Sequence, residues 1–163
     1  MKKHEISVRH TGLPASERLF IPLIKHWIRH TLTSEGVDVM CEVNVLVTDD
    51  SGMRELNREH RGIDESTDVL SFPLQEFPTP GWHKPPQSEF DPETGVLPLG
   101  DIVISAKQVK KQAQENFQPI ERETAYLAVH SVLHLLGYDH EDEAEGKKQM
   151  RTREKEILED MQQ

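Results

Sequence analysis

Three histidines lie close together near the C-terminal end of the sequence, at His130, His134 and His140. The first two are four residues apart, which separates them by only about 40° around an α-helix, so both imidazoles project from one face. Gly137 can adopt the left-handed conformation that ends a helix, and the chain can then turn back so that His140 approaches the same point. Three imidazoles are a ligand set of catalytic zinc sites, which keep a fourth position open for water. The spacing therefore predicts one Zn²⁺ ion per chain, bound on a helix and its following turn.

A histidine on a helix is more often solvated or hydrogen-bonded than bound to a metal, and this is our interpretation of six others: His4, His10, His26, His30, His60 and His83. A structural zinc site needs four ligands and often uses cysteine, but the one cysteine, Cys41, lies far away in the sequence. His130 and His134 also flank an apolar stripe without interrupting it. The stripe consists of Ala125, Ala128, Val129, Val132, Leu133 and Leu136. These features favour a catalytic metal site.

The length of 163 residues is that of one domain, with a core large enough to fold without crosslinks. We therefore predict a single metal-dependent hydrolase domain over residues 1–163. The single cysteine excludes an internal disulfide and suits a reducing compartment. The sequence starts without a charged and apolar leader, and it contains no apolar run of about 20 residues, the length that spans a membrane. We expect a soluble, cytoplasmic protein that does not bind membranes.

The net charge is −10, from 29 acidic residues against 19 lysines and arginines, and DNA is not an expected partner. The charge is uneven, because acidic residues gather at 141–145 while basic residues gather in two other stretches. The basic residues are Arg54, Arg58 and Arg61 in one stretch and Lys107, Lys110 and Lys111 in the other. A local basic wall beside a metal can bind phosphate even in an acidic protein. We expect these two stretches to line one groove.

Hydrophobic periodicity predicts strands interleaved with helices. Strands are expected at residues 4–9, 41–47, 68–72 and 101–105. Helices are expected at residues 16–33, 51–60, 105–116, 120–136 and 141–160. Residues 73–98 contain seven of the ten prolines and no helical period, so they are expected to form a long loop. This order predicts an α/β fold, a single-domain α-β-α sandwich around a four-stranded mixed sheet.

Hydrolysis is the expected chemistry of the site, because a zinc ion bound by neutral imidazoles lowers the pKa of bound water to about 7 or polarises a carbonyl or phosphoryl oxygen. The same histidine spacing occurs in the metzincin zinc peptidases, which place a glutamate directly after the first histidine to accept a proton. This sequence has Ser131 at that position. A serine hydroxyl is too weak a base near neutral pH, so a zinc metallopeptidase of metzincin type is the less favoured alternative.

The segment 130–140, His-Ser-Val-Leu-His-Leu-Leu-Gly-Tyr-Asp-His, resembles the signature of the YbeY family. Members of this family are bacterial zinc-dependent endoribonucleases that act in ribosomal RNA maturation. Other motifs match in the family's order, at residues 56–57, 61–62, 67–73, 100–104 and 142–145. The resemblance covers the chain from residue 40 or so to its end. Ser131 replaces a glycine of many members, and the loop 73–98 is longer than usual for the family.

The resemblance implies that His130, His134 and His140 are the zinc ligands and that Arg61 is the family's active-site arginine. These residues would form the catalytic site of a zinc-dependent, single-strand-specific endoribonuclease. That enzyme would act in late-stage ribosome quality control and in maturation of the 16S rRNA 3′ end, with ribosomal RNA, the small ribosomal subunit and its assembly proteins as partners. The chemistry of arginine supports this role, because a guanidinium stays charged and matches phosphate oxygens in shape. The alternative for Arg61 is a surface arginine at a helix end.

Two details of the mechanism stay open at the level of sequence. The nucleophile could be metal-bound hydroxide or the 2′-hydroxyl of the RNA itself. Asp139 and Glu141 are next to His140 and could orient its ring, although the acids at 141–145 also suit the first turn of a helix. We favour the helix-terminus role for all of these acids except Asp139. A non-catalytic ribosome-assembly factor, with a structural metal that holds the C-terminal turn, is a third functional hypothesis.

Overall fold

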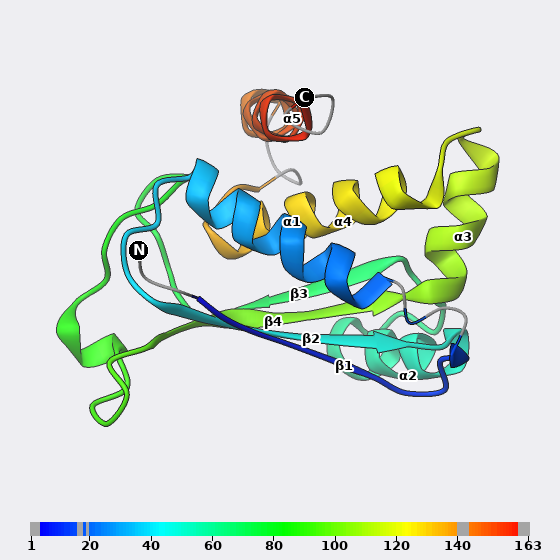
Figure 1. The fold of residues 1–163 in the computed structure, drawn as a ribbon, viewed down its shortest axis with the longest axis horizontal. Coiled ribbons are helices and arrows are strands. Elements are labelled where there is room, and N and C mark those ends of the chain that lie inside the picture. Colours follow the sequence, from blue (N-terminus) through cyan, green and yellow to red (C-terminus); the bar gives the residue numbers. More distant parts are fainter. Residues whose placement is uncertain (1–3, 16–17, 19, 140–143, 160–163) are drawn as a thin grey trace.

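The computed structural model describes residues 4–15, 18, 20–139 and 144–159, and its centre is a mixed four-stranded sheet (Figure 1). The strands are β1 (Glu5–His10), β2 (Cys41–Thr48), β3 (Val69–Pro73) and β4 (Leu97–Ser105), arranged in the order β1-β2-β4-β3. β2 pairs with β1 and β4 in parallel, whereas β3 pairs with β4 antiparallel. β3 is therefore an edge strand, with β4 as its one neighbour in the sheet.

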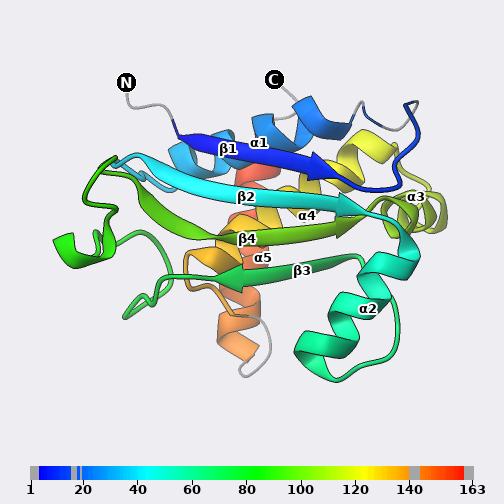
Figure 2. The ribbon, with the colours of Figure 1, turned by 90° about the horizontal axis from the view of Figure 1, so that it is seen from below.

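Helices cover the sheet unequally on its two faces (Figures 1 and 2). α1 (Phe20–Ser34) and α4 (Ile120–Leu135) lie on one face, and α5 (Ala144–Glu159) lies beyond them as an outer layer. α2 (Asp50–Arg61) lies on the opposite face near one end of the strands, and α3 (Ala106–Glu115) follows β4 at the same end. The predicted α/β fold with helices on both faces of a four-stranded mixed sheet is confirmed. None of the helices in the described ranges is long and apolar enough to cross a membrane.

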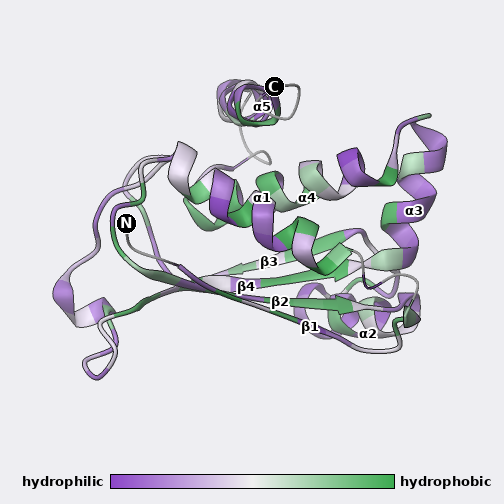
Figure 3. Ribbon diagram, in the orientation of Figure 1, coloured by the Kyte–Doolittle hydropathy of each residue, from purple (hydrophilic) through white to green (hydrophobic). Residues whose placement is uncertain are grey.

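The central helix α4 is buried on most of its surface, because the sheet, α1, α3 and α5 all pack against it. Its predicted apolar stripe lies in the main core, together with Leu127 and Leu135. Hydrophobic residues accordingly gather between the sheet and the helices α1 and α4, whereas the outer surface of α5 is hydrophilic (Figure 3). A helix held on several sides offers a rigid support for side chains that project into a cavity.

One glycine brings α4 unusually close to the sheet. Gly100 of β4 faces Leu135 of α4, and a Cβ atom built at Gly100 would lie 2.5 Å from Leu135 Cδ2 and 2.7 Å from the carbonyl oxygen of Phe72. Both distances are far below van der Waals contact, so a side chain at this position would force the helix or the neighbouring strand to move. Glycine is therefore required here for close packing and not for its backbone angles.

Several boundaries differ from the sequence prediction. β4 begins at Leu97 rather than at Asp101, because the strand continues through Pro98 beside an irregularity in the β2–β4 register between Glu42 and Val43. Proline is tolerated at such an irregularity, which the sequence pattern does not reveal. The proline-rich loop is correspondingly shorter and contains a 3-10 helix, η2 (Gln87–Glu89). α1 begins at Phe20, later than the predicted start at residue 16.

Candidate active site

A cavity of about 380 Å³ lies where α4 packs against β3, and the end of α2 contributes Arg61 to its lining. The strand side of its lining comes from β3 and the residues just before it, and the helix side comes from α4. The lining residues are Arg61, Thr67, Asp68, Val69, Leu70, Ser71, Tyr126, Leu127, His130 and His134. The cavity thus brings together three of the four predicted site residues, from segments that are far apart in the sequence.

His130 and His134 occupy successive turns of α4, and both line the cavity. Their ring centroids are 4.9 Å apart, with an angle of 80° between the ring planes. Both residues are half-buried, between the exposed and the buried faces of the helix. The prediction that the two imidazoles share one face of a helix is confirmed.

Glu154 of α5 reaches His130 from behind the cavity. Its Oε1 lies 2.9 Å from His130 Nδ1, and the two side chains are 7% and 17% exposed, respectively. A carboxylate can only accept a hydrogen bond, so we assign the ring hydrogen to Nδ1. Nε2 is then the nitrogen through which the ring would bind a metal, and the carboxylate would fix the orientation of the ring.

The turn after α4 has the conformation expected from the sequence. Gly137 has a φ of 92°, in the left-handed region, and the N–H groups of Gly137 and Tyr138 donate to the carbonyl oxygens of His134 and Leu133. The Tyr138 side chain is buried against the core. Gly137 therefore ends the helix and redirects the chain, as predicted.

The third predicted metal ligand, His140, lies outside the described residues, as does Glu141. Within the described ranges no group of three histidine, cysteine, aspartate or glutamate side chains is placed to hold a metal. The two histidines of α4 nevertheless form a donor pair that suits Zn²⁺, since one of them, His130, has a carboxylate on its Nδ1 and would keep Nε2 for a metal. Convergence of His140 on this pair stays a prediction.

Arg61 is the last residue of α2, and its side chain is exposed and lines the cavity opposite α4. Gly62 follows in the left-handed conformation, with a φ of 71°, and its N–H donates to the carbonyl oxygen of Arg58. No salt bridge engages Arg61 in the part of the chain that the structure describes. The guanidinium is therefore available to an anion that enters the cavity.

The segment between Arg61 and β3 is held by side-chain contacts to α2. The buried Asn57 donates from Nδ2 to the carbonyl oxygen of Glu65 at 2.8 Å. Arg54 makes a paired contact with Asp64, at 2.9 and 3.1 Å. These contacts fix the path of the chain between the helix and the strand, and thereby limit where Arg61 can lie.

Asp68 and Tyr126 also line the cavity, although sequence reasoning assigned neither a role. Asp68 accepts hydrogen bonds from Val69 N, Thr67 Oγ1 and Gln112 Nε2, at 2.8, 3.3 and 3.2 Å. Its carboxylate is thus occupied in shaping the entrance to β3. The ring of Tyr126 lies 5.7 Å from that of His130, at an angle of 30°. Burial, followed by the nearby carboxylates of Glu154 and Asp68, raises the pKa of Tyr126 to about 12.

The remaining basic residues do not join Arg61 at the cavity. Arg54 is paired with Asp64, and Lys107 lies 3.9 Å from the carboxylate of Asp50. Neither Arg58 nor the lysines of α3 line the cavity. The expectation that these residues form one groove with Arg61 is therefore wrong for this cavity, because Arg61 alone of them lies in its lining.

The protein is an α/β protein, and its mixed four-stranded sheet supports a cavity with a histidine pair on one side and an arginine on the other. The sequence profile of the family described as Endoribonuclease YbeY matches residues 5–162. The chain belongs to this family, as the resemblance of its motifs indicated.

Relatives and a solved structure agree with this assignment. Proteins named Endoribonuclease YbeY from Caldanaerobacter subterraneus subsp. tengcongensis and Clostridium beijerinckii are 49% and 42% identical, over 137 and 157 residues. The first match covers 84% of each chain and the second covers 92% of each. The solution structure of TM1509 from Thermotoga maritima is similar, with a TM-score of 0.56 and 26% identity, over 96% of this chain and 91% of that one.

Proposed function

We propose that this protein is a zinc-dependent endoribonuclease that cleaves single-stranded RNA in the cavity between α4 and β3. The observation that carries the proposal is the lining of that cavity, with His130 and His134 on one side and Arg61 on the other. Its relatives are named endoribonucleases, which supports RNA as the substrate. His140 completes the proposed ligand set.

When bound, Zn²⁺ would supply a Lewis acid next to the scissile phosphate and lower the pKa of a coordinated water to about 7. The protein's own contribution to this half of the site is orientation. α4 sets the spacing of the two imidazoles, and Glu154 fixes the His130 ring through its Nδ1 hydrogen. Because both supports are buried, the imidazoles need little reorganisation before they act.

Arg61 acts on the phosphate from the other side. Its guanidinium can donate two parallel hydrogen bonds to phosphate oxygens, and it offsets the negative charge that grows on them during phosphoryl transfer. A cation at this position would also place the scissile bond between the two sides of the cavity. The contacts that hold the segment after α2 give Arg61 a restricted range of positions.

A metzincin-type peptidase is disfavoured by the environment of Ser131. This residue is fully buried, and its hydroxyl donates to the carbonyl oxygen of Leu127 at 2.7 Å. It does not line the cavity. The position that carries the proton acceptor in metzincins therefore presents no basic group to a substrate here, whereas Arg61 provides a group suited to phosphate.

We further propose ribosomal RNA as the physiological substrate, with action in maturation of the 3′ end of 16S rRNA and in late-stage ribosome quality control. The family membership supports this assignment. The competing hypothesis is an assembly factor whose metal is structural. An Arg61 variant that keeps its metal and fold, and still supports ribosome maturation in cells, would favour that alternative over catalysis.

A metal analysis combined with an RNA-cleavage assay tests the proposal directly. Purified protein should contain one zinc ion per chain, cut single-stranded RNA, lose activity with a chelator and regain it when Zn²⁺ is restored. The variant Arg61→Glu, purified in parallel, controls for contaminating nuclease, because it should keep its zinc and lose cleavage. If the metal-replete protein leaves single-stranded RNA intact, the proposed function is wrong.

A further inference from the structure

α5 carries cations on both sides of its buried face, but the two sides differ in their partners. Arg153 on one side contacts Glu35 at 3.2 Å and Glu156 at 2.8 Å, and it also donates to the carbonyl oxygen of Ser34. These contacts tie α5 to the end of α1. On the other side, Lys147, Arg151 and Lys155 follow one another at intervals of four residues.

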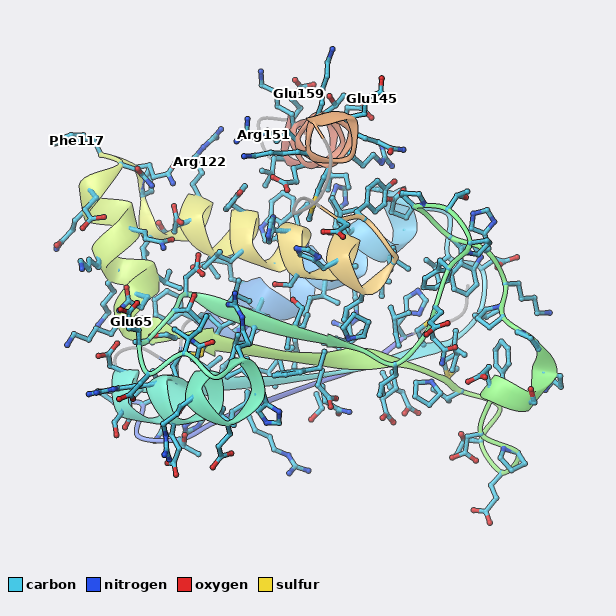
Figure 4. All side chains as sticks on the ribbon, turned by 180° about the vertical axis from the view of Figure 1, so that it is seen from behind. Glu65, Phe117, Arg122, Glu145, Arg151 and Glu159 are labelled. Carbon is cyan, nitrogen blue, oxygen red and sulfur yellow. The ribbon has the colours of Figure 1, made fainter. Side chains whose placement is uncertain are left out.

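The cations of this second side are exposed, and no salt bridge in the described ranges engages any of the three. They border a groove of about 670 Å³ between α5 and α4. The groove is lined by Tyr126, Lys147, Lys148, Arg151, Thr152, Glu154, Lys155 and Leu158. Figure 4 shows Arg151 projecting sideways from α5, whereas Glu145 and Glu159 lie on the side of α5 that is turned away from α4.

Tyr126 connects this groove with the proposed active site, because its side chain lines both the groove and the cavity. The residue is 36% exposed, so part of its ring is accessible to a ligand. Glu154 lies below the same junction and contacts His130. A strand that leaves the cavity past Tyr126 would therefore pass directly onto the cationic side of α5.

We propose that this groove binds the single-stranded RNA next to the cleavage position, with Lys147, Arg151 and Lys155 on its phosphates and Tyr126 stacked on a base. The inference rests on the proposed function and extends it to a second binding site. A cationic groove with an aromatic platform is the usual way to bind single strands without regard to sequence. The three cations span about 12 Å along the helix, which provides several phosphate contacts.

The local charge explains how an acidic protein can hold RNA here. The overall charge is −10, and isolated lysines on such a surface are usually only solvated. These three differ because they share one side of one helix, border a groove and reach a tyrosine that lines the proposed active site. A single strand suits the groove better than a duplex, because a paired base cannot turn its face to Tyr126.

The test compares two triple variants with the same change in charge. Lys147→Glu/Arg151→Glu/Lys155→Glu alters the groove, whereas Arg9→Glu/Lys84→Glu/Lys111→Glu alters exposed cations that line neither the groove nor the cavity. Fluorescence anisotropy measures binding of a labelled oligouridylate of about 12 nucleotides, a length within the range of known single-strand sites. Circular dichroism melts establish that both variants are folded, and gels establish that the strand is intact.

The groove variant should bind at least about tenfold more weakly at low salt. The slope of its log affinity against log salt concentration should also be shallower by about 2, because each of the three phosphate contacts on a single strand contributes about 0.7 to that slope. The control should change by less than about threefold. Tyr126→Ala should also weaken binding about tenfold, whereas Tyr126→Phe, which keeps the ring, should retain most of the wild-type affinity.

Equal RNA affinity of the two triple variants would overturn the inference. A groove variant that binds the oligouridylate as tightly as the wild-type protein would overturn it as well. The result is separable from the proposed function. A wild-type protein that cleaves RNA while the groove variant binds like wild type refutes only the groove. A wild-type protein that never cleaves RNA refutes the nuclease, and weak binding by the groove variant would then still support the groove.

Discussion

The two sides of the cavity position their functional groups by different means. The histidine side is a buried helix, with the His130 ring held from behind by the buried carboxylate of Glu154. The arginine side is the exposed end of α2, and its position depends on a few contacts made by the segment that follows it. A metal demands fixed ligand geometry, whereas a phosphate can be held by a long side chain with some freedom. The difference in burial therefore matches the difference in the proposed tasks.

The strongest test of this comparison removes a ligand from the buried side. We expect His134→Ala to lose bound zinc and to reduce RNA cleavage by at least about 10³-fold, because a Lewis acid contributes several kcal/mol to catalysis. Metal content and initial cleavage rates measure the two effects. His83→Ala, which alters an exposed histidine that contacts Thr79, serves as the control. Full zinc occupancy in His134→Ala would contradict the ligand assignment.

The next test changes the exposed side and leaves the ligands in place. We expect Arg61→Lys to lower kcat by about 10²–10³-fold with unchanged zinc content, because lysine keeps the charge but loses the paired donors. Single-turnover cleavage rates and metal analysis give the result. The matched control is Arg58→Lys, one turn earlier on α2 and outside the cavity lining. Equal loss in both variants would indicate a general charge effect.

A smaller effect is expected from the support behind His130. Glu154→Gln should weaken zinc affinity by about tenfold, at the low end of the range for groups that orient a metal-binding histidine. Competition with a chelating dye measures the affinity, and nitrogen NMR of the imidazole reports which ring nitrogen carries hydrogen. Glu156→Gln is the control, since Glu156 contacts Arg153 and not a histidine. An unchanged affinity and ring spectrum would assign Glu154 a packing role alone.

The smallest effect should come from the segment that follows Arg61. Asn57→Ala removes the hydrogen bond to the carbonyl oxygen of Glu65, which should lower the free energy of unfolding by about 1–2 kcal/mol. Cleavage should fall only a few-fold, with zinc content unchanged. Urea denaturation and steady-state kinetics measure these quantities, with the exposed Glu55→Ala as the control. Loss of zinc in Asn57→Ala would show that the two sides are not independent.

The histidine side could be predicted from sequence because its information is local. The spacing of His130 and His134 determines that they share a helix face, and Gly137 ends that helix in the left-handed conformation. The same local rules predicted the class of fold and most elements. They did not predict that β4 starts at Leu97, because a strand that passes through Pro98 depends on its register with β2.

The rest of the site depends on contacts between distant segments. Glu154 belongs to a helix with many charged residues, and only its place between Met150 and Ile157 in the buried stripe of α5 distinguishes it. Tyr126 looks like an ordinary surface residue until α5 packs beside it. Arg61 was found through the resemblance to a family, since its position opposite α4 follows from the packing of the whole sheet. The prediction of one basic groove formed by α2 and α3 was wrong for the same reason, because it too depends on how distant segments pack.

The close approach at Gly100 sets the distance between α4 and the sheet, and this distance determines the width of the cavity. Leu135, which rests on Gly100, is the neighbour of His134 on α4, and Phe72, whose carbonyl also meets this glycine, follows Ser71 of the cavity lining. A single methyl group added at the bottom of the core would therefore push the imidazoles and the opposite lining apart without touching either. Dimensions that matter for catalysis can thus be altered from a residue that no substrate ever reaches.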